Sequence, residues 1–125
     1  MLVIRLILAF AVLVSSTPGC GSFSSRNPSP ARSEVSVEVE NHNWSDITIY
    51  LMAGGLPQRL GMVTSLRTVI LVFPSQRLNT GGGVRLRALP VAGSSYTTET
   101  ILVLPGQTIT WTLENDLDHS SLTVY

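Results

Sequence analysis

Apolar and polar residues alternate along most of the chain beyond residue 34. The segment 35–40 places three valines at every second position, between serine and glutamate. A period of two with one apolar side is typical of a β-strand that buries one face. The same alternation returns at 47–52, 84–89 and 108–113, so each of these segments is predicted to be a strand.

Turn residues separate further strand candidates. Gly54 and Gly55 fall between 47–52 and 59–63, which predicts a hairpin, because glycine adopts the positive φ that tight hairpin turns require. The run 68–73 is apolar on both faces, and we expect it to be a central strand. Two more strands are expected at 98–104 and around Leu122 and Val124, with the polar turn 115–119 before the last one.

These segments amount to about eight short strands at spacings of roughly 8–14 residues, and no helical period follows residue 21. This organisation predicts an all-β fold, an antiparallel β-sandwich of 7–8 short strands spanning residues 34–125. The stretch ILVLPGQTITWTLEN loosely resembles immunoglobulin-like sandwich domains of extracellular bacterial proteins. That resemblance implies the architecture and no activity.

The first residues of the chain do not show this alternation of apolar and polar positions. Met1–Val14 carries one charge, at Arg5, followed by an uninterrupted apolar run from Leu6. The run is shorter than the roughly 20 residues that a membrane-spanning helix needs. Its length, the preceding positive charge and the small residues that follow are typical of a secretory signal peptide.

Cys20, the only cysteine, comes directly after this segment. A signal followed by small residues and cysteine resembles the lipobox of bacterial lipoproteins, here Thr17-Pro18-Gly19-Cys20. The resemblance implies cleavage before Cys20 and lipid attachment to its thiol. The resulting anchor of several acyl chains would keep the protein stably bound to the membrane. The alternative is ordinary secretion with cleavage after Ser16. We therefore divide the chain into a signal peptide at 1–19, the lipidated cysteine with a Ser/Pro-rich tether at 20–33, and the domain at 34–125.

Charge and composition narrow the choice of partners. Eight basic residues, all arginine, balance eight acidic ones. A neutral chain gives no electrostatic reason to expect a nucleic acid partner. The expected protein is a monomer of the bacterial cell envelope, anchored to the membrane through Cys20, or secreted or periplasmic if the anchor is absent.

The sequence contains none of the common motifs for catalysis, phosphate binding or metal binding. Ser45, Asp46 and His42 are too close in sequence to form a triad, so the domain is expected to be non-catalytic, with no cofactor. The favoured function is a structural or binding module for an envelope protein or a glycan. The alternative is a small metal carrier or accessory enzyme that brings together His42, Asp116, Asp118 and His119.

Two tryptophans and two arginines help to separate the core from a surface that could bind a partner. Trp111 alternates with apolar neighbours and is expected in the core. Trp44 lies in a polar turn and is expected to cap one end of the sandwich, or else to be an exposed aromatic that contacts a partner. Arg85 and Arg87 share an outward face, which is either solvated or part of a partner-binding surface.

Overall fold

The computed structural model describes residues 34–125, which form nine strands in two sheets. The segments assigned to the signal peptide, Cys20 and the tether lie outside the described residues. The strands are β1 (Glu34–Asn41), β2 (Ile47–Ala53), β3 (Leu56–Val63), β4 (Thr68–Pro74), β5 (Gly83–Pro90), β6 (Tyr96–Thr97), β7 (Ile101–Leu102), β8 (Thr108–Leu113) and β9 (Ser121–Val124).

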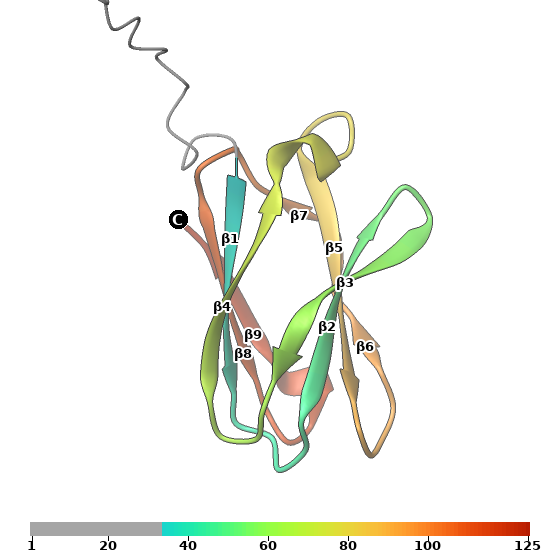
Figure 1. The fold of residues 1–125 in the computed structure, drawn as a ribbon, viewed down its shortest axis with the longest axis vertical. Helices are drawn as coiled ribbons and strands as arrows, with labels where there is room; N and C mark the ends of the chain where they lie inside the picture. Colours follow the sequence, from blue (N-terminus) through green and yellow to red (C-terminus); the bar gives the residue numbers. More distant parts are fainter. Residues whose placement is uncertain (1–33) are drawn as a thin grey trace, which may run out of the picture.

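The two sheets face each other across a single core, and the predicted β-sandwich is confirmed (Figure 1). One sheet has the order β4-β1-β8-β9. The other has the order β3-β2-β5-β6, and β7 also pairs with β5. A single sheet leaves both of its faces in solvent, so each sheet buries its apolar face by packing on the other.

The core consists of the inward side chains of both sheets, as the alternation predicted. Trp111 on β8 is 1% exposed, which confirms its expected place. Its ring lies 6.5 Å from that of Tyr96, tilted by 45°. The other fully buried large side chains come from β1, β2, β3, β4, β5 and β8: Val35, Val37, Val39, Ile47, Ile49, Leu51, Val63, Phe73, Leu86, Ile109 and Leu113.

The predicted hairpin is formed by β2 and β3, whose ladder runs from Ile47 opposite Val63 to Ala53 opposite Leu56. Gly54 and Gly55 make the turn with φ of 66° and 85°. Positive φ at both positions matches the right-handed twist of the strands. The register shifts between Ile49 and Tyr50, where a β-bulge bends the hairpin.

One pairing is parallel, although the sequence suggested antiparallel neighbours throughout. β1 runs alongside β8 in the same direction, with Val37 opposite Ile109 and Val39 opposite Trp111. The strands are distant in sequence, and their connection passes through the other sheet. Local alternation contains no information about that pairing.

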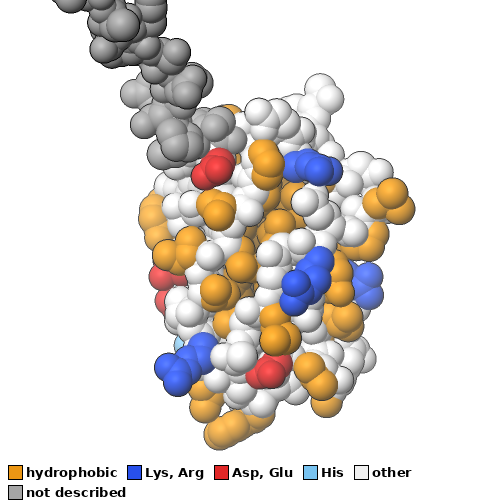
Figure 2. All heavy atoms as spheres, viewed as in Figure 1, with side chains coloured by type: hydrophobic (Ala, Val, Ile, Leu, Met, Phe, Trp, Pro, Cys, Tyr) orange, Lys and Arg blue, Asp and Glu red, His pale blue; other side chains and the backbone are white. Residues whose placement is uncertain are grey.

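The prediction that 68–73 is a central strand was wrong. β4 lies at the edge of its sheet and pairs only with β1 among the described strands. Its inward residue Phe73 is buried, but Ile70 and Val72 are 66% and 53% exposed. In Figure 2, drawn from the same side as Figure 1, hydrophobic side chains follow the region over β4. An apolar outer face therefore did not mean burial here.

The strand expected at 98–104 was also wrong, because only Ile101–Leu102, β7, is a strand there, and β6 ends before it, at Thr97. Thr98 interrupts the ladder to β5. Its N–H donates to Leu86 O at 2.8 Å, while its own hydroxyl accepts the Leu86 N–H at 3.0 Å. The Thr98 carbonyl accepts from Arg85 Nε at 3.1 Å. Side chains thus replace backbone partners, and regular pairing stops.

The connections gather at the two ends of the sandwich. β1 begins with Glu34 at one end, beside Pro74 and the 3₁₀ turn Ser75–Arg77. The loops 42–46, 64–67, 91–95 and 114–120 lie at the other end, which we call the loop end (Figure 1). Within residues 34–125, no helix is long and apolar enough to cross a membrane.

Candidate functional site: the loop end

The loop 42–46 is the centre of the loop end because hydrogen bonds join it to all three neighbouring loops. The buried Asn41 fixes its start. The two N–H groups of Asn41 Nδ2 are shared among the carbonyls of Ser45 (2.9 Å), Val63 (3.3 Å) and Thr64 (3.2 Å). Its Oδ1 accepts the Asn43 N–H at 2.9 Å. One buried amide therefore satisfies backbone groups on two loops, as a buried polar group must.

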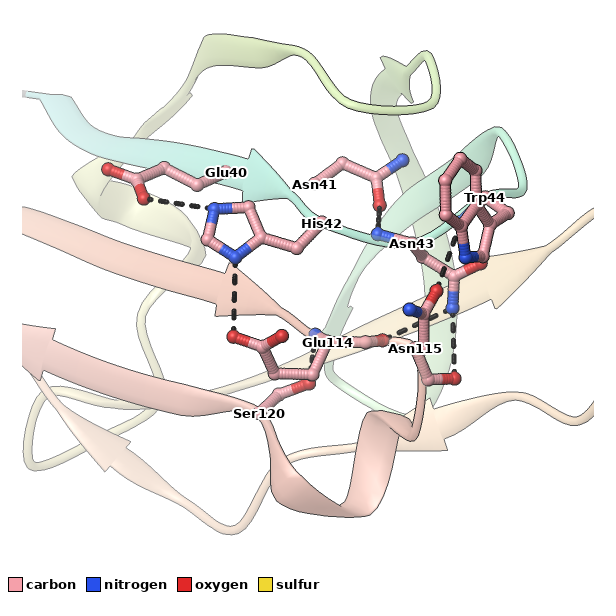
Figure 3. Close-up of polar contacts among 8 residues, drawn as sticks. All are labelled: Glu40, Asn41, His42, Asn43, Trp44, Glu114, Asn115 and Ser120. Atoms are coloured by element: carbon pink, nitrogen blue, oxygen red, sulfur yellow. Dashed lines mark hydrogen bonds and ion pairs between the residues drawn. The ribbon is translucent and has the colours of Figure 1, made fainter.

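Asn43 and Trp44 tie the loop to 114–120. Asn43 Nδ2 donates to the carbonyls of Glu114 and Asn115, both at 3.1 Å, and its Oδ1 accepts from Ser45 N at 2.8 Å. The Trp44 N–H donates to Asn115 Oδ1 at 3.3 Å (Figure 3). The His42 N–H donates to Leu113 O at 2.8 Å and continues the same attachment.

The other two loops are fastened in the same way. Ser65 donates its hydroxyl to Asn43 O at 3.0 Å and its N–H to Asp46 Oδ1 at 2.9 Å. The Val91 N–H donates to Asp46 O at 2.9 Å. Since each loop has a direct bond to 42–46, the loop end is held in one arrangement, and side chains on it are positioned by a rigid scaffold.

Trp44 does not cap the core, so that expectation was wrong. The side chain is 76% exposed. Leu117, from the 3₁₀ turn Leu117–His119, is the residue of the four loops at this end that joins the core. The sequence placed Leu117 in a polar turn, where a single leucine between two aspartates gives no periodic signal. The Trp44 backbone is held by Asn115, and the indole lies in solvent.

Two further apolar side chains are exposed at this end. Val91 follows β5, and Leu66 lies in the turn that Arg67 N closes on Thr64 O at 3.2 Å. Leu66 has a φ of 58°, a conformation that glycine adopts easily and that costs other residues about 1–2 kcal/mol. A leucine that is both strained and exposed contributes nothing evident to folding. Strain of this kind is often found at functional positions.

A hollow of about 200 Å³ lies beside these loops. Residues 92–96 form one wall, residues 115–118 form the other, and Asn43 contributes to the lining. The Asp116 carboxylate belongs to the second wall and is already engaged, because its Oδ1 accepts the Asp118 N–H at 3.2 Å. The lining of the hollow is mostly polar, and the hollow is open to solvent.

The four residues of the metal hypothesis do not meet: His42 lies apart from His119 and Asp116, and Asp118 joins Asp116 only through its backbone N–H. His42 Nδ1 lies 3.3 Å from Glu114 Oε1, and its Nε2 lies 3.8 Å from Glu40 Oε2. His119 Nδ1 lies 2.8 Å from Asp116 Oδ2. Across residues 34–125, no group of three or more His, Cys, Asp or Glu side chains is arranged to hold a metal ion.

Arg85 and Arg87 lie on the outer face of the second sheet, as expected. The strand register places Tyr50 between Arg87 on one side and Arg59 on the other. Arg59 joins this face only because of the bulge in the β2–β3 ladder, which the alternation of residues along the chain does not reveal. Neither Arg85 nor Arg87 forms an ion pair with another described residue. The Nε of Arg87 is buried without a hydrogen-bond partner among these residues.

Comparisons with known proteins supply no family. No protein-family model matches the sequence, and no curated protein is similar to it. Among solved structures, the chain is similar to the NMR structure of a protein from Eubacterium rectale, with 12% sequence identity and a TM-score of 0.46. That likeness covers 78% of this chain and 91% of the other one.

Proposed function

We propose that the protein is a lipid-anchored component of the bacterial cell envelope whose non-catalytic β-sandwich binds another envelope protein at its loop end. The observation that carries this proposal is Trp44. Its indole is largely in solvent although its loop is fastened by hydrogen bonds to three other loops. The backbone of Trp44 is fixed while its large apolar side chain stays in water, and tryptophan is the kind of residue that dominates binding energies.

Rigidity matters because association has to overcome the entropy of ordering both surfaces. A loop that is already fixed loses little further freedom when a partner binds. Tryptophan adds a large contact area with only two side-chain torsions to restrict. The bonds that Asn41, Asn43 and Ser65 make around Trp44 therefore favour binding as much as they favour folding.

The other exposed apolar side chains of the loop end favour a protein over a glycan as partner. Leu66 and Val91 are exposed on loops that bond directly to 42–46. Two exposed apolar side chains at the same end of the sandwich as an exposed tryptophan suit the core of a protein interface. A glycan would depend on the polar hollow beside the loops, where Asp116 is already engaged.

The position of the loop end agrees with an anchor at Cys20. The described domain begins at Glu34, and the loop end lies at the opposite end of the sandwich (Figure 1). A lipid on Cys20, joined through 20–33, would therefore attach at the end remote from Trp44. Such a protein would present its binding loops away from the membrane to which it is tethered.

The anchor is tested by mass and by localisation. Intact-mass analysis of the membrane-extracted protein should show an acylated chain that begins at Cys20. Cys20→Ser should release the protein or leave its precursor unprocessed. A soluble wild-type chain that begins at Thr17, the residue after the alternative cleavage site, would show ordinary secretion instead.

Binding is tested by cross-linking in intact envelopes, followed by mass spectrometry of the cross-linked species. Trp44→Ala should reduce a specific cross-linked product at least about tenfold, because a central aromatic contributes more than about 1.4 kcal/mol to such interfaces. Leu102→Ala is the matched control, since Leu102 is an exposed apolar residue on β7, away from the loop end. Equal loss in both variants would contradict a site at Trp44. Retention on purified peptidoglycan that depends on Trp44 would favour the glycan.

A further inference from the structure

The free edge of β4 is unlike the other sheet edges of the domain. Among the described residues, β4 pairs with β1 on one side and with no strand on the other. It is seven residues long. In Figure 1 no other strand covers its outer side.

The remaining edges are short or interrupted, which is how natural sheets avoid unwanted pairing. β9 has four residues, and β6 and β7 have two each. β3 carries Pro57 and Arg59, and its ladder to β2 contains a bulge. β4 has no charged residue and no bulge, and its only proline is its last residue.

The ladder to β1 shows which backbone groups of β4 face outward. The Asn41 N–H donates to Arg67 O at 2.9 Å, one step beyond the Glu40–Thr68 pair of the same register. In an antiparallel ladder, hydrogen-bonded pairs alternate with pairs that are not bonded. Val69, Leu71 and Phe73 therefore bond to β1, and Thr68, Ile70 and Val72 direct their N–H and C=O groups to the free edge.

The same residues expose their side chains. Ile70 and Val72 project from the outer face of the sheet, and both are more than half exposed. β4 thus offers a row of backbone donors and acceptors together with two β-branched apolar side chains. Such an edge is a template for pairing with another strand.

We propose that β4 pairs with β4 of a second copy of this chain, antiparallel and centred on Leu71. In that register Ile70 stands opposite Val72 of the partner subunit, and Val72 stands opposite Ile70 of the partner subunit. These are positions whose backbone groups point outward, so each such pair forms two hydrogen bonds. The four exposed side chains meet on one face and leave water. Two four-stranded sheets become one continuous sheet.

A second copy fits this edge because the strand is its own complement. A two-fold interface uses the same patch on both subunits, so residues symmetric about its centre must match. Ile70 and Val72 are symmetric about Leu71 and are similar in shape and polarity. The only mismatch lies at the ends, where Pro74 faces Thr68 of the partner subunit and cannot donate. This pairing would replace the monomer that the sequence suggested, and it depends on neither the anchor nor the loop end.

The test is the oligomeric state of the detergent-solubilised full chain, measured by sedimentation at detergent density match. Wild-type protein should sediment as a dimer at about 50 µM, a concentration suited to an interface of modest size. Ile70→Lys places a charge in the apolar strip. Val72→Pro removes an N–H that points to the free edge and leaves the ladder to β1 intact. Each variant should raise the dissociation constant at least about tenfold.

Two controls make the outcome decisive. Leu102→Lys adds the same charge at an exposed leucine of β7 and should leave the dimer unchanged. Circular dichroism shows whether Val72→Pro keeps its sheet content; if it does not, Ile70→Lys decides. A wild-type monomer at about 50 µM, or a dimer unaffected by Ile70→Lys, would overturn the proposal. Pairing of a wild-type monomer with an extended peptide would show that the edge serves another protein.

Discussion

Replacing Asn41 with alanine tests whether one buried amide holds the loop end together. Its side chain is 1% exposed, its two Nδ2–H groups are shared among three carbonyl oxygens, and its Oδ1 accepts one N–H. In Asn41→Ala all four bonds disappear. The Val63 carbonyl bond is buried, and the bonds at Ser45 and Thr64 are partly buried.

The expected loss of stability depends on how far each lost hydrogen bond is buried. A buried acceptor left without a donor costs about 1–3 kcal/mol, whereas a bond that water can replace contributes about 0.5–1.5 kcal/mol. Loss of the Val63 bond together with the partly buried ones should lower the free energy of unfolding by about 3 kcal/mol. The chain reversal before β2 would lose its main support, so Trp44 should also become more mobile.

Urea unfolding of the segment 34–125, followed by far-ultraviolet circular dichroism, measures this quantity. His42→Ala is the matched control, because His42 is adjacent and half exposed, its ring pairs with the partly exposed carboxylates of Glu40 and Glu114, and its backbone bond to Leu113 is kept in alanine. It should change stability by less than about 0.5 kcal/mol. If Asn41→Ala loses less than about 1 kcal/mol with an unchanged m value, water substitutes for the amide and the loop end is not fastened as described.

Three further substitutions test the packing. Trp111→Ala should lower the free energy of unfolding by about 3–5 kcal/mol in the same urea experiment, since it empties a buried site between the sheets; a loss below about 1 kcal/mol would place Trp111 at the surface. Leu66→Gly relieves a φ of 58°, so it should stabilise the domain by up to about 1 kcal/mol and also weaken binding at the loop end. An unchanged melting temperature would contradict this prediction. Deletion of Ser121–Tyr125 removes β9 and the paired backbone bonds between Thr108 and Tyr125, and should abolish cooperative unfolding; a sharp transition in the shortened chain would show that β9 is dispensable.

Alternation along the chain predicted most of the strands and nearly all of the core. Val35, Ile49 and Trp111 are buried where a period of two places them, because successive side chains of a strand point to opposite faces. The glycine pair at 54 and 55 predicted the hairpin for an equally local reason, the positive φ of its turn. These features depend on residues close together in the sequence, and so a single chain reveals them.

Tertiary structure decided what depends on distant residues. The run at 68–73 is apolar on both faces, yet only the strand order shows that β4 is an edge with Ile70 in solvent. Trp44 is exposed, whereas Leu117, about 70 residues later in the chain, joins the core at that end. The site follows from the same cause. Asn41, Asn43 and Ser65 are unremarkable turn residues in sequence, and they become a scaffold only when the fold brings four loops to one end of the sandwich.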